Sequence, residues 1–144
     1  MRCVDDHDDM ISFPVDDVRL DLCPECKGIW FDAGELERCA EKPARKIRDT
    51  FGAVITARTT EGLRGPTRRC PRCEKVMDKE RFLGGVWIDR CPDRHGVWLD
   101  AGEMHAVYEQ MKAYDQLPAQ GSKGNPLLDF VALQFAVLFR PLLK

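Results

Sequence analysis

The residues of this chain best suited to chemistry are its cysteines and histidines, which fall into two sets of similar spacing. Their members are Cys3, His7, Cys23 and Cys26 in the first set, and Cys70, Cys73, Cys91 and His95 in the second. The gaps between the two pairs of each set, 15 and 17 residues, are typical of paired zinc knuckles. Three thiolates and one imidazole form a ligand set that Zn²⁺ prefers, and four protein ligands close a structural site. The sequence therefore predicts two structural zinc sites.

Two details of these sites stay open. Asp6 stands where a C-x2-C pair would place its second ligand, but an imidazole matches a thiolate-rich site better, which favours His7. Iron is an alternative metal for the same cage, although this donor set suits zinc better. Cys39 and His105 are left over, and we interpret them as a small partly buried hydrophobe and a helix-surface residue.

Each C-x2-C pair also has a redox interpretation. Cys23-Pro24-Glu25-Cys26 and Cys70-Pro71-Arg72-Cys73 look like the dithiols of thiol oxidoreductases. Such a dithiol belongs between a strand and a helix of a larger α/β fold, whereas each pair here has a second ligand turn at zinc spacing. We therefore expect a protein that is not an enzyme, with a thiol redox enzyme as a weaker alternative.

The chain contains an internal repeat that carries these ligands. Residues Gly28–Leu36 recur as Gly96–Met104 at an offset of 68, with six of nine positions identical. An offset of 67 carries Cys3 onto Cys70, so one residue is missing between the two matches. The chain is thus two copies of a unit of about 40 residues.

Each unit is expected to place a short alternating strand between its two ligand turns, at Val15–Leu22 and at Phe82–Arg90. The two turns clamp the ends of this hairpin-like region, which is a way to stabilise a unit too small for an adequate core. Gly28 and Gly96 follow the second turn of each unit, where we expect a sharp bend with positive φ.

A helix is expected to begin after each strand region. Asp32 is followed three residues later by Glu35, and Asp100 by Glu103, which is the spacing of a capping box with Asp at the cap. The acids also suit the positive end of a helix dipole. Capping explains all four carboxylates without a catalytic role.

The motifs together resemble a known family. Cys70-Pro71-x-Cys73, Gly85–Pro92 and Gly96–Met104 resemble the bacterial zinc-ribbon family named after the zinc finger of transcription factor IIB, and the pattern reappears over residues 1–39. That family usually has four cysteines at the metal, so the resemblance carries over the six cysteines of the two sets, while this chain departs from it at His95 and at His7 or Asp6. The resemblance implies structural zinc and suggests a transcription-related or nucleic-acid role, although a fold likeness does not fix function.

The cysteine count and the N-terminal residues indicate the cellular compartment in which the protein is expected. The chain has 144 residues and seven cysteines, and it opens without the pattern of a secretory signal. An odd cysteine count without such a signal favours a reducing compartment, so we expect a cytoplasmic protein. No stretch approaches the roughly 18 to 20 apolar residues that span a bilayer, which makes a membrane an unlikely partner.

Charge is unevenly distributed along the chain. Residues 1–41 carry a net −8 and residues 42–81 a net +7, within a total of −2. The basic residues of the middle segment are Lys42, Arg45, Lys46, Arg48, Arg58, Arg64, Arg68, Arg69, Arg72, Lys75, Lys79 and Arg81. This segment is suited to phosphates, which makes nucleic acid a candidate partner. The same basic residues can equally form ion pairs with the acidic N-terminal segment of the same molecule.

The last segment, 126–144, is apolar. Between Asp129 and Arg140 the only polar side chain is that of Gln134. A helix that is apolar all round is buried against something. It can dock on the zinc units, pair with a second copy or another protein, or lie on a membrane, and the small, charged zinc units favour a protein partner.

We therefore expect a small α+β protein with two tandem zinc ribbons, each a β-hairpin plus a helix, and a C-terminal apolar helix. The expected parts are a first ribbon (1–41), a basic linker (42–66), a second ribbon with its helix (67–117), a flexible break (118–125) and the apolar helix (126–144). The expected function is an interaction or adaptor module that self-associates through its C-terminal helix. The alternative is nucleic-acid or transcription-machinery binding through residues 42–81.

Overall fold

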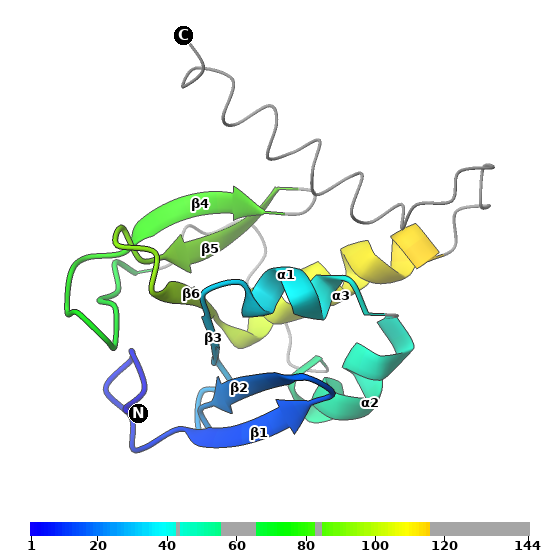
Figure 1. The fold of residues 1–144 in the computed structure, drawn as a ribbon, viewed down its shortest axis with the longest axis horizontal. Helices are drawn as coiled ribbons and strands as arrows, with labels where there is room; N and C mark the ends of the chain where they lie inside the picture. Colours follow the sequence, from blue (N-terminus) through cyan, green and yellow to red (C-terminus); the bar gives the residue numbers. More distant parts are fainter. Residues whose placement is uncertain (43, 56–65, 83–84, 116–144) are drawn as a thin grey trace, which may run out of the picture.

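The computed structural model describes residues 1–42, 44–55, 66–82 and 85–115 (Figure 1). Its elements are β1 (Ile11–Val15), β2 (Val18–Leu22), β3 (Ile29–Asp32), α1 (Glu35–Ala40), α2 (Ala44–Ile55), β4 (Asp78–Phe82), β5 (Val86–Arg90), β6 (Gly96–Leu99) and α3 (Ala101–Asp115). The predicted small α+β class is confirmed. The expected break at 118–125 and the expected apolar helix at 126–144 lie outside the described residues.

The two repeats share one six-stranded sheet. The strand order is β1-β2-β3-β6-β5-β4, and all neighbouring strands are antiparallel. The central pair joins the repeats, because Trp30 of β3 pairs with Trp98 of β6, its own equivalent in the other repeat. An antiparallel pair centred on equivalent residues has a local two-fold axis. The repeats therefore meet as the two halves of a symmetric dimer would, within one chain.

The strands predicted at Val15–Leu22 and Phe82–Arg90 are wrong as single elements, because each contains a hairpin turn. In the first repeat Val15 pairs with Val18, and Asp16 occupies the turn with φ 53°. In the second repeat the turn lies between Phe82 and Val86. Aspartate tolerates the left-handed conformation that a tight turn requires, so this turn needs no glycine. Because the alternating apolar pattern also continues across the turn, the sequence reads as one strand.

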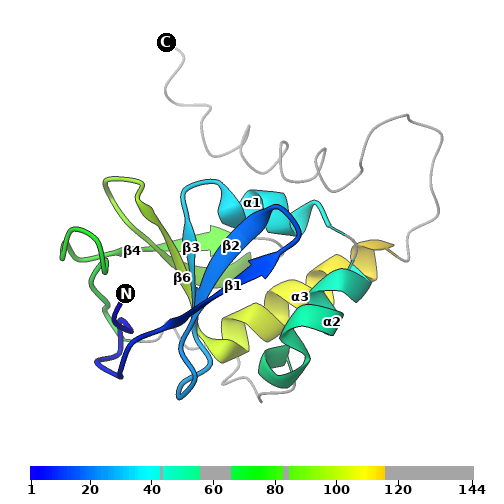
Figure 2. The ribbon, with the colours of Figure 1, turned by 60° about the horizontal axis from the view of Figure 1, so that its bottom comes forward.

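The two faces of the sheet bury different groups. Ile29 and Phe31 of β3 point into a large apolar core beneath the helices, while Trp30 points to the opposite face. There Trp30 and Trp98 pack among the cysteines of both ligand sets. Figure 2 shows α2 and α3 side by side. The helices thus stabilise one face of the sheet, and the ligand loops occupy the other.

Gly28 and Gly96 do not have the positive φ predicted for them. The left-handed residues of these turns are Lys27, with φ 62°, and Arg94, with φ 60°. Both glycines are needed for a different reason, which is the close approach of the other repeat.

A side chain at either glycine would collide with a tryptophan across the local two-fold axis. A Cβ atom at Gly28 would lie 2.1 Å from Cζ2 of Trp98. A Cβ atom at Gly96 would lie 2.6 Å from Cζ2 of Trp30 and 2.2 Å from the carbonyl oxygen of Phe31. Each repeat therefore has a glycine, which lacks a side chain, at the position where the tryptophan of the other repeat packs against its ligand turn.

The segment expected to be a basic linker contains helix α2. Lys42, just before it, pairs with Asp17 at 2.5 Å, and Lys46 pairs with Asp16 at 2.7 Å. These pairs tie the start of α2 to the turn between β1 and β2. No helix among the described residues has the length and apolar character needed to cross a membrane.

Candidate metal centres

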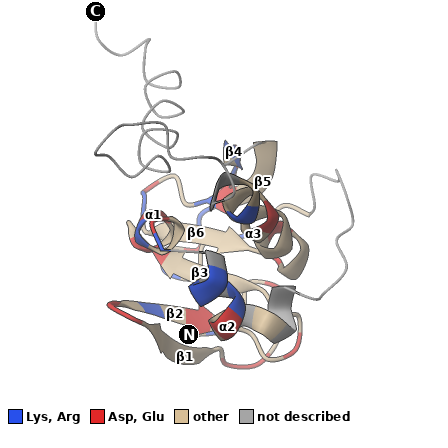
Figure 3. Cartoon of the chain, turned by 90° about the vertical axis from the view of Figure 1, so that its right-hand side faces the viewer, with Lys and Arg blue, Asp and Glu red and all other residues tan. Residues whose placement is uncertain are grey.

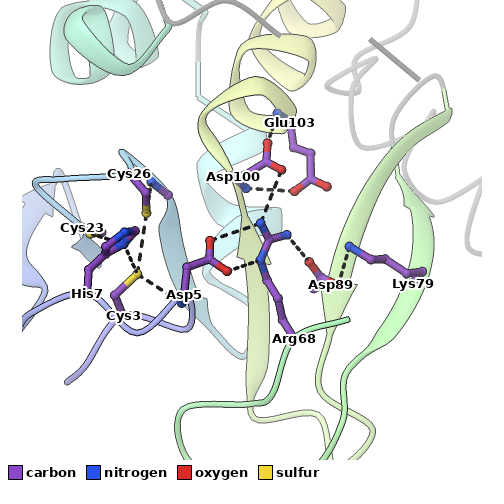
Figure 4. A network of polar contacts seen from close by, with 11 residues as sticks. Cys3, Asp5, His7, Cys23, Cys26, Arg68, Lys79, Asp89, Asp100 and Glu103 are labelled. Atoms are coloured by element: carbon purple, nitrogen blue, oxygen red, sulfur yellow. Dashed lines mark hydrogen bonds and ion pairs between the residues drawn. The ribbon is translucent and has the colours of Figure 1, made fainter. Parts of the chain in front are cut away.

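The first ligand set converges at one end of the sheet, where a loop before β1 meets the turn after β2. The ligand atoms of Cys3, His7, Cys23 and Cys26 all lie within 4.8 Å of one another. The Sγ atoms of Cys3 and Cys26 are 3.6 Å apart, and Nδ1 of His7 lies 3.5 Å from Sγ of Cys3 and 3.8 Å from Sγ of Cys23. Figure 4 shows the imidazole of His7 directed at these sulfurs.

The second ligand set repeats this geometry in the equivalent place. Cys70, Cys73, Cys91 and His95 likewise have their ligand atoms within 4.8 Å of one another. Sγ of Cys73 is 3.6 Å from Sγ of Cys91, and Nδ1 of His95 is 3.5 Å from Sγ of Cys91 and 3.9 Å from Sγ of Cys70. The structure thus brings together all eight residues predicted as ligands, in two separate groups of four.

These distances are those of a tetrahedral zinc cage. With bonds of about 2.3 Å to sulfur and about 2.0 Å to nitrogen, a tetrahedron separates two sulfurs by about 3.8 Å, and a sulfur from a nitrogen by about 3.5 Å. A disulfide would instead bring two sulfurs to about 2.05 Å, and all seven cysteines are free thiols. The two groups therefore fit two zinc sites with three sulfurs and one nitrogen each.

The backbone of three of the ligand turns donates hydrogen bonds to sulfur. The N–H groups of Asp5, Gly28 and Arg72 lie 3.4 Å from Sγ of Cys3, Cys26 and Cys70, respectively. The residues that turn the backbone with positive φ are Asp6, Lys27, Glu74 and Arg94, one in each ligand turn. Such N–H groups stabilise thiolates and orient them, which is the usual task of groups behind a metal's direct ligands.

The cysteines need a cation to ionise together. Burial raises the pKa of Cys26 to about 12 and that of Cys70 to about 11. Burial also opposes ionisation of Cys23, but the N–H groups of Cys26 and Glu25 bring its pKa below the usual value. Thiols with such high pKa values stay protonated at neutral pH unless a positive ion is close. The protein would hold Zn²⁺ through these eight residues, and the ion would supply the charge that keeps six thiolates together.

The residues left in doubt by the sequence are now placed. His7 belongs to the first ligand group, while Asp6 is exposed in the turn before it, with φ 60°. Cys39 is buried in α1, where burial raises its pKa to about 12, and it is not part of either group. His105 lies in α3 at intermediate exposure.

The predicted capping boxes differ between the repeats. In the second repeat the box is reciprocal: the N–H of Glu103 donates to Asp100 at 2.8 Å, and the N–H of Asp100 donates to Glu103 at 2.9 Å. In the first repeat only the N–H of Asp32 donates to Glu35, at 2.7 Å, and α1 begins after Gly34 without a side-chain cap. The box at Asp32 is therefore only half formed.

Asp32 is used for other contacts. Its carboxylate accepts hydrogen bonds from Nε1 of Trp30 at 2.9 Å and from the guanidinium of Arg72 at 2.7 and 2.6 Å. Arg72 lies inside a ligand turn of the second repeat. The sequence held no signal for this pairing, because the two residues are 40 positions apart.

A buried network of charges was also missed by sequence reasoning. Arg68, only 7% exposed, contacts Asp5 at 2.8 Å, the fully buried Asp89 at 3.0 Å and Asp100 at 3.8 Å. Lys79 reaches the other oxygen of Asp89 at 2.8 Å. Figure 4 shows this chain of contacts running from the first ligand group to the start of α3. Arg68, one of the basic residues of segment 42–81, thus has its guanidinium surrounded by carboxylates of the same chain.

Much of the basic segment is paired within the molecule in the same way. Lys42, Lys46, Arg68 and Arg72 all contact acidic residues of the first repeat, and Lys75 contacts Asp93 at 2.7 Å. Figure 3 shows acidic and basic residues interleaved on the side that carries α2 and the β1–β2 hairpin. The expected attraction between the acidic first repeat and the basic segment is confirmed.

Comparison with known proteins agrees with this geometry. The family model described as transcription factor zinc-finger, a zinc ribbon of the transcription factor IIB type, matches residues 2–42 and again residues 69–110. Each match contains the four ligands of one site, and together they cover more than half of the chain. No curated protein and no solved structure matches the chain.

Proposed function

This chain belongs to the transcription factor IIB-type zinc-ribbon family, and from that premise we propose that it is a non-enzymatic adaptor held rigid by two structural zinc ions. The observation that carries the proposal is the closed ligand set of each site. Catalytic zinc sites keep one position for water or substrate, whereas four protein ligands at tetrahedral distances leave none. Each ion thus serves the fold, and recognition falls to the surface that the two ribbons present.

The apolar C-terminal segment supports self-association as the mode of assembly. Among the residues that the structure describes, the large hydrophobic side chains that are exposed are those of Ile11 and Val76. This surface offers little to cover the apolar residues of 126–144 within the same molecule. A second copy of the segment supplies the matching apolar surface, because a helix that is apolar all round associates with its like.

Truncation before residue 126 tests this assembly. The full chain is expected to sediment as a dimer or larger, and the truncated chain as a monomer that still binds two zinc ions. Leu133→Asp and Leu138→Asp are expected to act like the truncation, while Gln134→Asp adds the same charge at the polar position and serves as the matched control. An unchanged sedimentation mass after truncation would refute self-association through this segment.

Nucleic-acid binding through residues 42–81 is the competing proposal, and exposed basic residues test it. Arg45 and Arg69 are exposed, so their replacement by Glu removes surface charge without entering the buried network. Salt-dependent retention of DNA or RNA that is lost in these variants would favour this proposal over the adaptor role. In either case a chain whose seven cysteines form no disulfide suits a reducing compartment, and we propose the cytoplasm.

A further inference from the structure

The loop that holds each ion also contacts the other repeat. We propose that the two zinc sites are coupled, so that binding of the first ion raises the affinity for the second. The inference rests on the two zinc sites but not on the adaptor role. It concerns contacts that join the repeats across the centre of the sheet.

The first contact runs from site one to the second repeat through Asp5. Its backbone N–H donates to Sγ of Cys3, and its carboxylate accepts two hydrogen bonds from Arg68, at 2.8 and 3.2 Å. Arg68 continues to Asp89 of β5 and Asp100 at the start of α3. Figure 4 shows Asp5 between the sulfurs and this guanidinium. The position of the Asp5 carboxylate therefore depends on the same turn that positions a ligand.

The second contact runs in the opposite direction through Arg72. The repeat offset of 67 makes Arg72 the equivalent of Asp5, and its N–H donates to Sγ of Cys70 in the same way. Its guanidinium makes the two bonds to Asp32 of the first repeat. Each repeat thus extends one charged side chain from a ligand turn to the other repeat, with opposite charges at the two equivalent positions.

Two further features join the ligand turns themselves. The carbonyl oxygen of His95, a ligand of site two, accepts a hydrogen bond from the N–H of Ala33 in the first repeat at 3.0 Å. Trp30 and Trp98, both fully buried, lie in one cluster with cysteines of both sites. The ring of Trp98 also packs on Gly28, the residue whose N–H donates to Sγ of Cys26.

These contacts produce coupling because a zinc turn is ordered only when its ion is bound. Loading one site fixes the partners that the other repeat's ligand turns require, so the second ion binds to a partly assembled site. Coupling between sites typically changes affinity by about 5- to 150-fold, and it acts equally in both directions. Two independent sites, in contrast, would load without regard to each other.

Native mass spectrometry of the full chain during titration with Zn²⁺ tests the proposal, because it counts chains with zero, one and two ions. At half loading, independent equal sites place half of the chains in the one-ion state, and unequal sites place more there. A five-fold coupling lowers that population to about 30%, and a hundred-fold coupling to about 10%. The affinity of each site alone, measured with the other site disabled by Cys91→Ser or Cys23→Ser, gives the one-ion population expected without coupling. A measured population equal to or above that value would overturn the proposal. A chain that binds no zinc would instead refute the zinc sites themselves. Failure of the coupling and failure of the zinc sites therefore give different results.

Asp5→Asn tests whether the coupling uses the contacts described. It removes the charge that faces Arg68 and keeps all eight ligands, while Asp8→Asn makes the same charge change at an exposed residue of the same loop. The one-ion population at half loading is expected to rise in Asp5→Asn and to match the wild type in Asp8→Asn, with two ions bound at saturation in both. Equal populations in Asp5→Asn and the wild type would overturn the assignment of the coupling to this contact.

Discussion

Gly28→Ala should place a methyl group where the ring of Trp98 packs against the first repeat. Its new Cβ would lie 2.1 Å from Cζ2 and 2.6 Å from Cη2 of Trp98, so the ring or the turn must move by more than an ångström. Trp98 is fully buried in the cluster with the cysteines, so a movement of its ring displaces the neighbouring side chains. Overpacking of this kind costs about 1–3 kcal/mol, and the central position favours the upper end of that range. A loss of about 3 kcal/mol corresponds to a fall in Tm of about 10 °C for a domain of this size.

The assay is urea unfolding of the zinc-loaded chain, followed by tryptophan fluorescence and by far-UV circular dichroism. Gly52→Ala is the matched control, because Gly52 lies in α2 and a Cβ there meets nothing within 4 Å. That change should stabilise the protein by about 0.5–1 kcal/mol through helix propensity. The same substitution is thus expected to have opposite signs at the two positions.

A second variant ties the cost to the tryptophan. Trp98→Phe shortens the ring that Gly28→Ala would strike, so the added cost of Gly28→Ala should be smaller in that background than in the wild type. The reasoning would be refuted if Gly28→Ala unfolded at the same urea concentration as the wild type, or if its cost were unchanged by Trp98→Phe.

Four further predictions concern the metal and the start of α3. Removing zinc with a chelator is expected to unfold both repeats, because site assembly and folding are one event; an unchanged far-UV dichroism spectrum would contradict this. Cys91→Ser leaves site two with three ligands, and elemental analysis is expected to find no more than one zinc ion per chain. Asp100→Ala removes the acceptor for the N–H of Glu103 and is expected to cost about 0.5–2 kcal/mol in urea unfolding. Burial and the charge of Asp100 raise the pKa of Glu103 to about 7, so the stability that this group contributes is complete below its unfolded pKa of about 4.3 and is lost as the pH rises through 7. Glu103→Gln should therefore unfold at higher urea than the wild type at pH 8, and the reverse order at that pH would contradict the assignment.

The metal sites were largely predictable because their signal is local. Each ligand pair lies on one tight turn, so the spacing within Cys23-x2-Cys26 or Cys91-x3-His95 already limits where the ligand atoms can be. The choice of His7 rested on the preference of a thiolate-rich site for imidazole and on the C-x3-H turn at Cys91 and His95, because the repeat itself aligns Asp6 with Cys73. The helix start at Asp100 was predictable for the same reason, since a capping box spans only four residues.

The sequence by itself determined the two cysteine sets, the repeat and the α+β class, since each depends on residue type and short spacing. Tertiary structure alone decided that the repeats share a sheet through Trp30 and Trp98, because two strands of four residues with no turn between them carry no pairing signal. It also decided that Gly28 serves a close approach rather than a bend, and that Arg68 is buried among carboxylates rather than exposed to solvent. These outcomes depend on which surfaces pack together in space. The sequence around a charged residue or a glycine is the same whichever surface that residue packs against, so the sequence alone does not reveal the contact.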